Sequence, residues 1–292
     1  MVLPIHLLLV PGTIAAAIAV AVPALPSGYE STLFYDDFSS PTSLTSADSA
    51  WVFDLGTSYP GGPERWGTGE IQTYTDSPSN IGVQNDVLTI TPLLNNTGTQ
   101  AKIRLGTAPA ATQSGIWPAF WALGSAYRGV YTNWPSVGEL DILESPNGLP
   151  TTWHTLHCGT APGGPCNETT GVGSSAPFPR DGAFHVISAE IDRSSSSSSS
   201  SSPSYPYRAR SWRDESIVWA VDGLETFRVT GDQVGDSAAW TALAHDAKFL
   251  LLNVAVAGSF PDAIAGKRTP DARARGGAGA AMEVDYVAVY ST

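Results

Sequence analysis

The chain has 292 residues, which is long enough to bury a sizeable core, and an all-β sandwich of this length commonly forms one domain. It carries 15 Lys and Arg against 27 Asp and Glu, so its net charge is -12. This charge argues against a nucleic-acid partner, because a phosphate backbone is bound by a basic surface. The nine Trp offer flat apolar faces that fill a core or stack on sugar rings, and composition does not choose between these uses.

The N-terminal segment contains an apolar run, LLLVPGTIAAAIAVAVPA, which ends in small residues as a cleavable secretory signal does. We therefore expect a signal peptide over residues 1–22, although no Lys or Arg precedes Arg65 and a Pro-Gly pair interrupts the run. Such a run is short for a bilayer crossing, so no stable membrane insertion is expected after cleavage. Sequons at Asn95 and Asn167 also fit a secreted glycoprotein, extracellular or cell-wall-associated, which we expect to be a monomer.

The chain from Thr32 onward consists of short β-type runs separated by Gly, Pro, Asn and Asp, without helical periodicity over several turns. Between two of these runs lies Asp222-Gly223, a pair favoured in tight hairpins. The pattern predicts an all-β fold of two stacked antiparallel sheets. The expected strands are TLFYDDF, VLTITP, AKIRLG, IWPAFWAL, GELDILE, TWHTLHC, FHVISAEID, SIVWAVDG, ETFRVTG, FLLLNVAVAG and MEVDYVAVY.

Two segments interrupt the strands without indicating a domain boundary. Residues 194–204 hold a serine run that cannot bury apolar surface, so we expect a surface insertion there. Residues 267–281 are rich in Arg, Gly and Ala and are expected to form a long connection before the last strand.

The two cysteines, Cys158 and Cys166, lie close together across a Gly/Pro segment. In an oxidising compartment they are expected to form a disulfide, and two free buried thiols are the alternative. A zinc site is not expected, because His154 and His157 lie nearby without a second Cys pair.

The strand GELDILES carries three acids. Regular alternation puts Glu139 and Asp141 on one face and Leu140 and Ile142 on the other, whereas Glu144 breaks the alternation. A one-residue bulge would return Glu144 to the acidic face, and bulges are frequent beside active sites. Four strand steps of about 3.3 Å, less two inclined Glu side chains of roughly 4 Å each, leave about 5 Å between carboxyl groups.

That separation is typical of a retaining glycosidase, in which one carboxylate attacks carbon and the other protonates the leaving oxygen. The charge of Asp141 would raise the pKa of the acid and fix the geometry of the nucleophile. The alternative is a solvated strand face whose acids serve only solubility.

The sequences SGIWPAFWALG and WPSVGELDILES resemble glycoside hydrolase family 16, especially its fungal laminarinase-like and mixed-linkage β-glucanase members. Most of the chain from Leu33 to Tyr290 takes part in the resemblance, which implies a β-jelly-roll sandwich with a concave substrate cleft over residues 27–292. It further implies secreted, endo-acting hydrolysis of β-1,3 or mixed β-1,3/1,4 glucans by double displacement, with no required cofactor. The other matching blocks are YPGGPERWGTGEIQTYTDSPSNIGVQNDVLTITP, WHTLHCG, FLLLNVAVAGSFPD and MEVDYVAVY.

By position in the family motif, Glu139 resembles the nucleophile, Asp141 the assisting residue and Glu144 the acid/base. For the tryptophans, core packing is the alternative to a sugar platform, and Trp134 is either a cleft-edge platform or a loop anchor. His154 is interpreted as structural, and Asn253 either satisfies buried backbone or touches sugar. The candidate substrate-binding residues are Trp117, Trp121, Trp134, His157, Asn80 and Tyr74.

Asp285 resembles an acid that helps to bind a structural calcium in some family members, but calcium needs several oxygen ligands. The sequence identifies no others, so the metal ligands are unknown and no calcium site is predicted.

One segment departs from the family pattern. Relatives usually carry an additional strand pair where LLNNTGTQ alone separates Pro92 from Ala101, and its loss is expected to expose sheet edges and apolar neighbours unless the edges rearrange. The shortened segment keeps a non-catalytic glucan-binding jelly roll as one alternative. A cell-wall β-glucan transglycosylase is the other, because a sugar hydroxyl could intercept the same covalent intermediate in place of water. The intact pair Glu139 and Glu144 favours the enzyme.

Overall fold

The computed structural model describes residues 25–40, 44, 46, 49–95, 98–100, 109–193 and 211–291. The expected signal peptide over residues 1–22, the expected strand AKIRLG and the serine insertion lie outside the described residues. Within the described part of the chain, no helix is long and apolar enough to cross a membrane.

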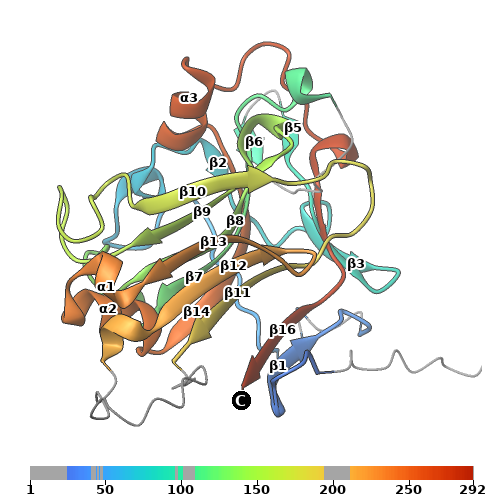
Figure 1. Cartoon of the computed structure of the whole chain (residues 1–292). Coiled ribbons are helices and arrows are strands. Elements are labelled where there is room, and N and C mark those ends of the chain that lie inside the picture. Colours follow the sequence, from blue (N-terminus) through green and yellow to red (C-terminus); the bar gives the residue numbers. More distant parts are fainter. Residues whose placement is uncertain are drawn as a thin grey trace, which may run out of the picture.

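The largest sheet has five strands and carries the acidic strand at its centre (Figure 1). All four of its pairings are antiparallel. In spatial order the strands are β10 (Val172–Pro177), β9 (Thr151–His157), β8 (Glu139–Glu144), β7 (Ile116–Gly124) and β14 (Lys248–Val256).

The second layer is divided into smaller sheets, which together with the large sheet make the predicted β sandwich. The serine insertion connects β11 and β12, which are neighbouring antiparallel strands, so it does not separate domains. The smaller sheets are β11 (Ile187–Asp192), β12 (Ser216–Val221) and β13 (Leu224–Thr230); β15 (Met282–Val284), β4 (Val87–Ile90) and β3 (Ile81–Gln84); and the pair β1 (Ser31–Asp36) and β16 (Val287–Ser291).

The shortened segment after Pro92 forms a small hairpin of β5 (Leu93–Asn95) and β6 (Gly98–Gln100). Strand β6 also pairs with β2 (Gln72–Thr73), and this pairing is parallel. The expectation of purely antiparallel sheets is therefore wrong at this pair, because β2 arrives from a long loop rather than from a hairpin.

The helices are few and short. The sequence pattern did not predict these helices. Capping residues could have indicated two of them, because α1 starts at a capping box between Thr230 and Gln233 and the Asp236 side chain caps α2. The helices are α1 (Gly231–Val234), α2 (Ser237–Ala244) and α3 (Ser259–Ala265), with 3-10 turns η1 (Glu64–Gly67), η2 (Ala110–Thr112), η3 (Ser125–Tyr127), η4 (Pro146–Gly148), η5 (Trp212–Asp214) and η6 (Ala278–Ala280).

The two larger apolar clusters of the described residues lie between the layers. In the first, Leu140 and Ile142 of β8 pack with Trp219 of β12 and with helix α2. In the second, the ends of β7 and β14 pack with β4, β15 and β16, for example through Val254 and Leu88. The large sheet therefore turns its aliphatic face inward and leaves its acidic face to the cleft.

The predicted bulge in β8 is confirmed by the strand register. On β7, Phe120 pairs with Leu143 and Trp121 pairs with Asp141, so Ile142 is the extra residue. The register with β9 also shifts between Asp141 and Glu144. This single insertion places Glu144 on the face that already holds Glu139.

Two side chains satisfy the carbonyl groups that the bulge removes from the ladder. The Trp219 indole N–H donates to the Asp141 carbonyl at 2.8 Å. His154, which is fully buried, bonds through Nδ1 to the Ile142 carbonyl at 2.9 Å and through Nε2 to the Thr226 hydroxyl at 3.0 Å. His154 is thus placed in the structural role predicted for it. Buried carbonyls without such partners would cost stability.

We expect Trp219→Phe to lower the free energy of unfolding by about 1–3 kcal/mol, because the Asp141 carbonyl stays buried and loses its donor. Urea unfolding followed by circular dichroism measures the change. Trp212→Phe, whose partly buried ring packs under Arg213 at the border of the same cluster, is the control and should change stability less. An equal loss in both variants would contradict the role given to the Trp219 N–H.

Candidate functional site

The three carboxylates of β8 line a cleft of about 350 Å³. Four of the six candidate binding residues, Trp117, Trp121, Trp134 and Tyr74, line the same cleft. Trp117 and Trp121 come from β7, beside the acidic strand, and Tyr74 follows β2. The fold therefore brings these residues together from separate parts of the chain.

His157 at the end of β9 joins the acidic group. Its Nε2 lies 3.6 Å from Asp141 Oδ2, and its Nδ1 lies 2.8 Å from Glu168 Oε2. The Trp134 ring centroid lies 5.4 Å from that of His157. The histidine thus sits between the carboxylates of β8 and a fourth carboxylate, Glu168, which the sequence interpretation missed.

Burial dominates the protonation of these acids. Burial raises the pKa of Glu139, while the charge of His157 and a hydrogen bond from Trp134 act in the opposite direction. The pKa of Asp141 is raised well above its usual value, first by burial and then by the charges of Glu144, Glu139 and Glu168. Asp141 is therefore the member of the group that most strongly favours the protonated form.

Glu144 has a different environment. Burial raises its pKa to about 7, and the charge of Glu139 adds to this, whereas His157 and the Trp117 hydrogen bond oppose it. The Trp117 indole N–H donates to Glu144 Oε1 at 2.9 Å. Trp117 is only 9% exposed, so it presents an edge to Glu144 and offers little free ring surface. Glu144 is thus suited to hold a proton near neutral pH.

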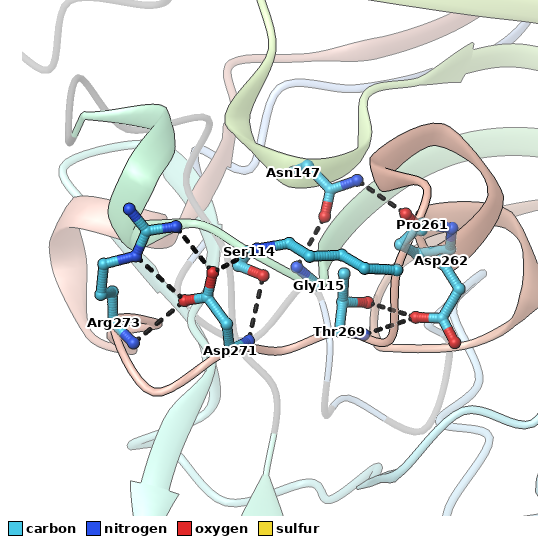
Figure 2. Close-up of polar contacts among 9 residues, drawn as sticks. Ser114, Gly115, Asn147, Pro261, Asp262, Thr269, Asp271 and Arg273 are labelled. Carbon is cyan, nitrogen blue, oxygen red and sulfur yellow. Dashed lines mark hydrogen bonds and ion pairs between the residues drawn. The ribbon is translucent and has the colours of Figure 1, made fainter.

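Loops behind the cleft hold Trp117 from its far side. The Phe260 ring of α3 lies 5.4 Å from Trp117 and 5.8 Å from Trp153. The Asn147 side chain accepts from the Gly115 N–H at 2.7 Å and donates to the Pro261 carbonyl at 2.9 Å (Figure 2).

The connection that follows α3 is fixed by two acids. Asp262 accepts from the N–H and hydroxyl of Thr269, and Asp271 binds the Ser114 hydroxyl through its N–H and pairs with Arg273 and Lys267 (Figure 2). The Arg- and Gly-rich connection before the last strand is therefore anchored to the start of β7.

A second hydrogen-bond chain crosses the other side of the cleft. The Trp121 indole donates to Asn253 Oδ1 at 2.7 Å, Asn253 Nδ2 donates to the Tyr74 hydroxyl at 2.9 Å, and that hydroxyl lies 3.3 Å from Glu70 Oε2. Gln72 and Thr68 also donate to Glu70, whose pKa is raised by burial. Asn253 therefore bonds to cleft side chains. In the sequence GEIQTYT, Glu70, Gln72 and Tyr74 alternate, and this alternation was the pattern from which the hydrogen-bond chain could have been predicted.

Asn80 does not share the cleft with the other candidates. It is 1% exposed, its Oδ1 accepts from the Thr75 hydroxyl at 2.8 Å, and its Nδ2 donates to the Thr91 carbonyl at 3.4 Å. This placement corrects the expectation of a sugar contact, because the amide already serves buried protein groups.

An aromatic rim borders the cleft. Tyr59 stacks on Tyr131 with centroids 4.2 Å apart, and its edge meets Trp66 at 4.9 Å. Arg128 forms two bonds to Asp54, at 2.6 and 2.9 Å. The sequence interpretation did not single out this rim, since its members come from separate loops.

The far end of the cleft is apolar and reaches between the layers. Leu250 and Leu252 of β14 line it together with Leu88 and Ile90 of β4. Among the described residues, β14 has a strand partner only on its β7 side. The expectation that the shortened segment exposes a sheet edge and its apolar neighbours stays a prediction, because residues 101–108 lie outside the described part of the chain.

Cys158 and Cys166 form the predicted disulfide. In the part of the chain that the structure describes, the only cluster of three or more His, Cys, Asp or Glu with ligand atoms within 4.8 Å of one another is Glu139, Asp141 and His157. These are the carboxylate-site residues themselves, and Asp285 belongs to no such described cluster. We assign no metal site.

We expect Tyr74→Phe to lower the free energy of unfolding by about 1–3 kcal/mol, because buried Glu70 and Asn253 each lose the hydroxyl they share. Chemical denaturation checks this value. Tyr127→Phe, on the rim of the same cleft, is the control and should stay within about 0.5 kcal/mol of the wild type. A Tyr74 variant as stable as the control would show that the hydrogen bonds linking Trp121, Asn253, Tyr74 and Glu70 add nothing to the stability of the fold.

Comparisons with known proteins identify the kind of molecule that has this architecture. The family model described as "XgeA-like, catalytic GH16 domain" matches residues 105–199. The crystal structure of an endo-1,3-beta-glucanase from Streptomyces sioyaensis has 38% sequence identity and a TM-score of 0.78, covering 92% of this chain and 98% of that chain.

Two sequence relatives are more distant. Glucan endo-1,3-beta-glucosidase A1 of Niallia circulans is 28% identical over 302 residues, which cover 94% of this chain and 40% of that protein. Beta-glucanase of Rhodothermus marinus is 28% identical over 265 residues, which cover 82% of this chain and 78% of that protein. The chain thus spans less than half of the Niallia protein.

Proposed function

Because the chain belongs to glycoside hydrolase family 16, we propose that it is an endo-acting, retaining β-glucanase that cleaves β-1,3 or mixed β-1,3/1,4 glucans. The observation that carries this proposal is the pair Glu139 and Glu144, placed on one face by the bulge and held in different environments. A retaining mechanism needs two such carboxyl groups, one ionised and one protonated at the start.

In the first step, Glu139 acts as the nucleophile and attacks the anomeric carbon. His157 and the Trp134 hydrogen bond favour its ionised form. Glu144 gives its proton to the leaving glycosidic oxygen, so the bond to the departing sugar breaks as the glycosyl–enzyme bond forms. Asp141 keeps its proton, because three neighbouring buried carboxyl groups do not all ionise together.

In the second step, the carboxylate of Glu144 takes a proton from water, and the water oxygen attacks the anomeric carbon. Glu139 leaves as a carboxylate, and two displacements restore the original anomeric configuration. The carboxyl groups supply the nucleophile, acid and base, so the proposed mechanism requires no cofactor.

Several features support a polysaccharide substrate. The cleft is lined by Trp121, Trp134 and Tyr74, whose rings suit the apolar faces of sugars. The similar proteins of Niallia circulans and Streptomyces sioyaensis are a glucan endo-1,3-beta-glucosidase and an endo-1,3-beta-glucanase, which supports a 1,3-linked glucan as the substrate. A disulfide and an exposed sequon at Asn167 support the further proposal that the protein is secreted, with cell-wall association as an option.

The decisive experiment incubates purified protein with laminarin and with barley β-glucan and follows reducing ends and product lengths. We expect shorter products, and we expect Glu139→Gln to lose activity by about 10³-fold or more because the nucleophile is gone. The control is Glu225→Gln, which removes the same charge from an exposed glutamate of β13 and should retain activity.

Two other outcomes would replace the proposal. Longer products would indicate transfer to a sugar hydroxyl, as in a transglycosylase. Folded protein that binds glucan without turnover would indicate a non-catalytic glucan-binding jelly roll.

The pH dependence of kcat/KM should be bell-shaped. Activity falls as the pH rises through about 7, because Glu144 loses its acid proton there. Activity also falls at acid pH as Glu139 takes up a proton, and burial raises the pKa of Glu139, so this limb lies above the pH expected for a free glutamate. Initial rates of reducing-end release across this range give both limbs.

An aryl β-glucan oligosaccharide provides the control for this profile, because its leaving group departs without a proton. With that substrate the alkaline limb should disappear and the acid limb should remain. An alkaline limb that persists would contradict the assignment of Glu144 as the acid.

A further inference from the structure

Glu168 is a buried carboxylate beside the catalytic group that the two displacement steps do not use. Its side chain is fully buried. Its Oε2 lies 2.8 Å from His157 Nδ1, and its Oε1 accepts from the Cys158 N–H at 2.8 Å. We propose that Glu168 is a positioning residue, which fixes His157 with Nδ1–H directed to Glu168 and Nε2 directed to the catalytic carboxylates.

The hydrogen bonds determine this orientation. An ionised carboxylate only accepts, so the Nδ1 atom of His157 must carry the proton that it shares with Glu168. Nε2 is then the atom that faces Asp141 Oδ2, at 3.6 Å. This is the arrangement in which a carboxylate selects the tautomer and ring orientation of a working histidine.

The loop that carries Glu168 is held at several points. The Cys158–Cys166 disulfide closes the segment just before Glu168, and the Gly163 N–H of that segment donates to the Glu168 carbonyl at 2.6 Å. The ring of His157 is held as well, since a Cβ at Gly171 would lie 2.9 Å from its Cε1 atom, while Trp134 packs near it from the other direction. Both partners of the Glu168–His157 pair are thus held by contacts from neighbouring segments.

The charges around His157 give the pair a consequence for catalysis. Four carboxyl groups face it: Glu139, Asp141 and Glu144 from β8, and Glu168 from the loop that follows Cys166. Burial alone lowers the pKa of His157, but the hydrogen bond to Glu168 and the charges of Glu139, Glu168 and Glu144 outweigh it, so the pKa is raised. The resulting imidazolium opposes the raised pKa of Glu139 and so favours the ionised nucleophile.

The effect of Glu168 on catalysis rests on the proposed function, whereas its effect on His157 does not. Glu168→Gln separates the two. The Gln side-chain oxygen still accepts from the Cys158 N–H, which leaves its NH₂ group facing His157 Nδ1. Because an NH₂ group donates, Nδ1 must then accept, so the ring loses its Nδ1 proton and keeps the proton on Nε2.

We test this with ¹⁵N NMR of the histidine side chains as the pH is varied. The wild type should show His157 charged near neutral pH and protonated at Nδ1. Glu168→Gln should lower the pKa of His157 and give the neutral Nε2–H tautomer. If wild-type His157 is neutral with its proton on Nε2, the proposal is overturned without any variant, and a Glu168→Gln ring that keeps its Nδ1 proton at neutral pH overturns it as well.

Activity on laminarin provides the second readout. We expect Glu168→Gln to reduce kcat/KM by about tenfold or more, and Glu225→Gln to leave it unchanged. If Glu168 acts through His157, adding Glu168→Gln to His157→Asn should cause little further loss. If the losses in kcat/KM of Glu168→Gln and His157→Asn multiply in the double variant, or if Glu168→Gln lowers only the stability, Glu168 has a purely structural role. Absence of any wild-type turnover would instead reject the proposed function while the NMR result still stands.

Discussion

The extra residue in β8 is the constraint on which the rest of the site depends. Without the bulge at Ile142, Glu144 would face the apolar cluster between the layers. With it, two backbone carbonyls leave the ladder and must find donors inside the protein. Trp219 comes from the opposite layer and His154 from the adjacent strand, so the catalytic geometry is tied to the packing of the whole sandwich.

The site concentrates negative charge in a place that water reaches poorly. Such a group is tolerable only if some carboxyl groups stay protonated and a cation stands nearby. Asp141 and Glu144 meet the first condition through their raised pKa values, and His157 meets the second. These differences in protonation make the buried cluster stable, and they also give its members different chemical roles. Stability and the proposed catalysis therefore depend on the same arrangement of charges.

Much of this could be predicted from local sequence. Strand alternation in GELDILES predicted the bulge, and the cysteine spacing predicted the disulfide. Glu168 and Glu70 were missed because their partners lie elsewhere in the sequence. Glu168 bonds to His157, and Glu70 is linked to Asn253 through Tyr74. Asn80 was misplaced for the same reason, since alternation does not reveal which amides are buried.

The two sides of the cleft differ in how firmly they are built. Around His157 the walls are closed by a disulfide, a backbone bridge and a glycine with no space for a side chain. Beside β14 the wall is apolar, and the described strands leave that edge unpaired. Under the proposed function, the proton transfers take place on the first side, where Asp141, His157 and Glu168 lie close together, and the apolar second side offers surface to the faces of sugar rings.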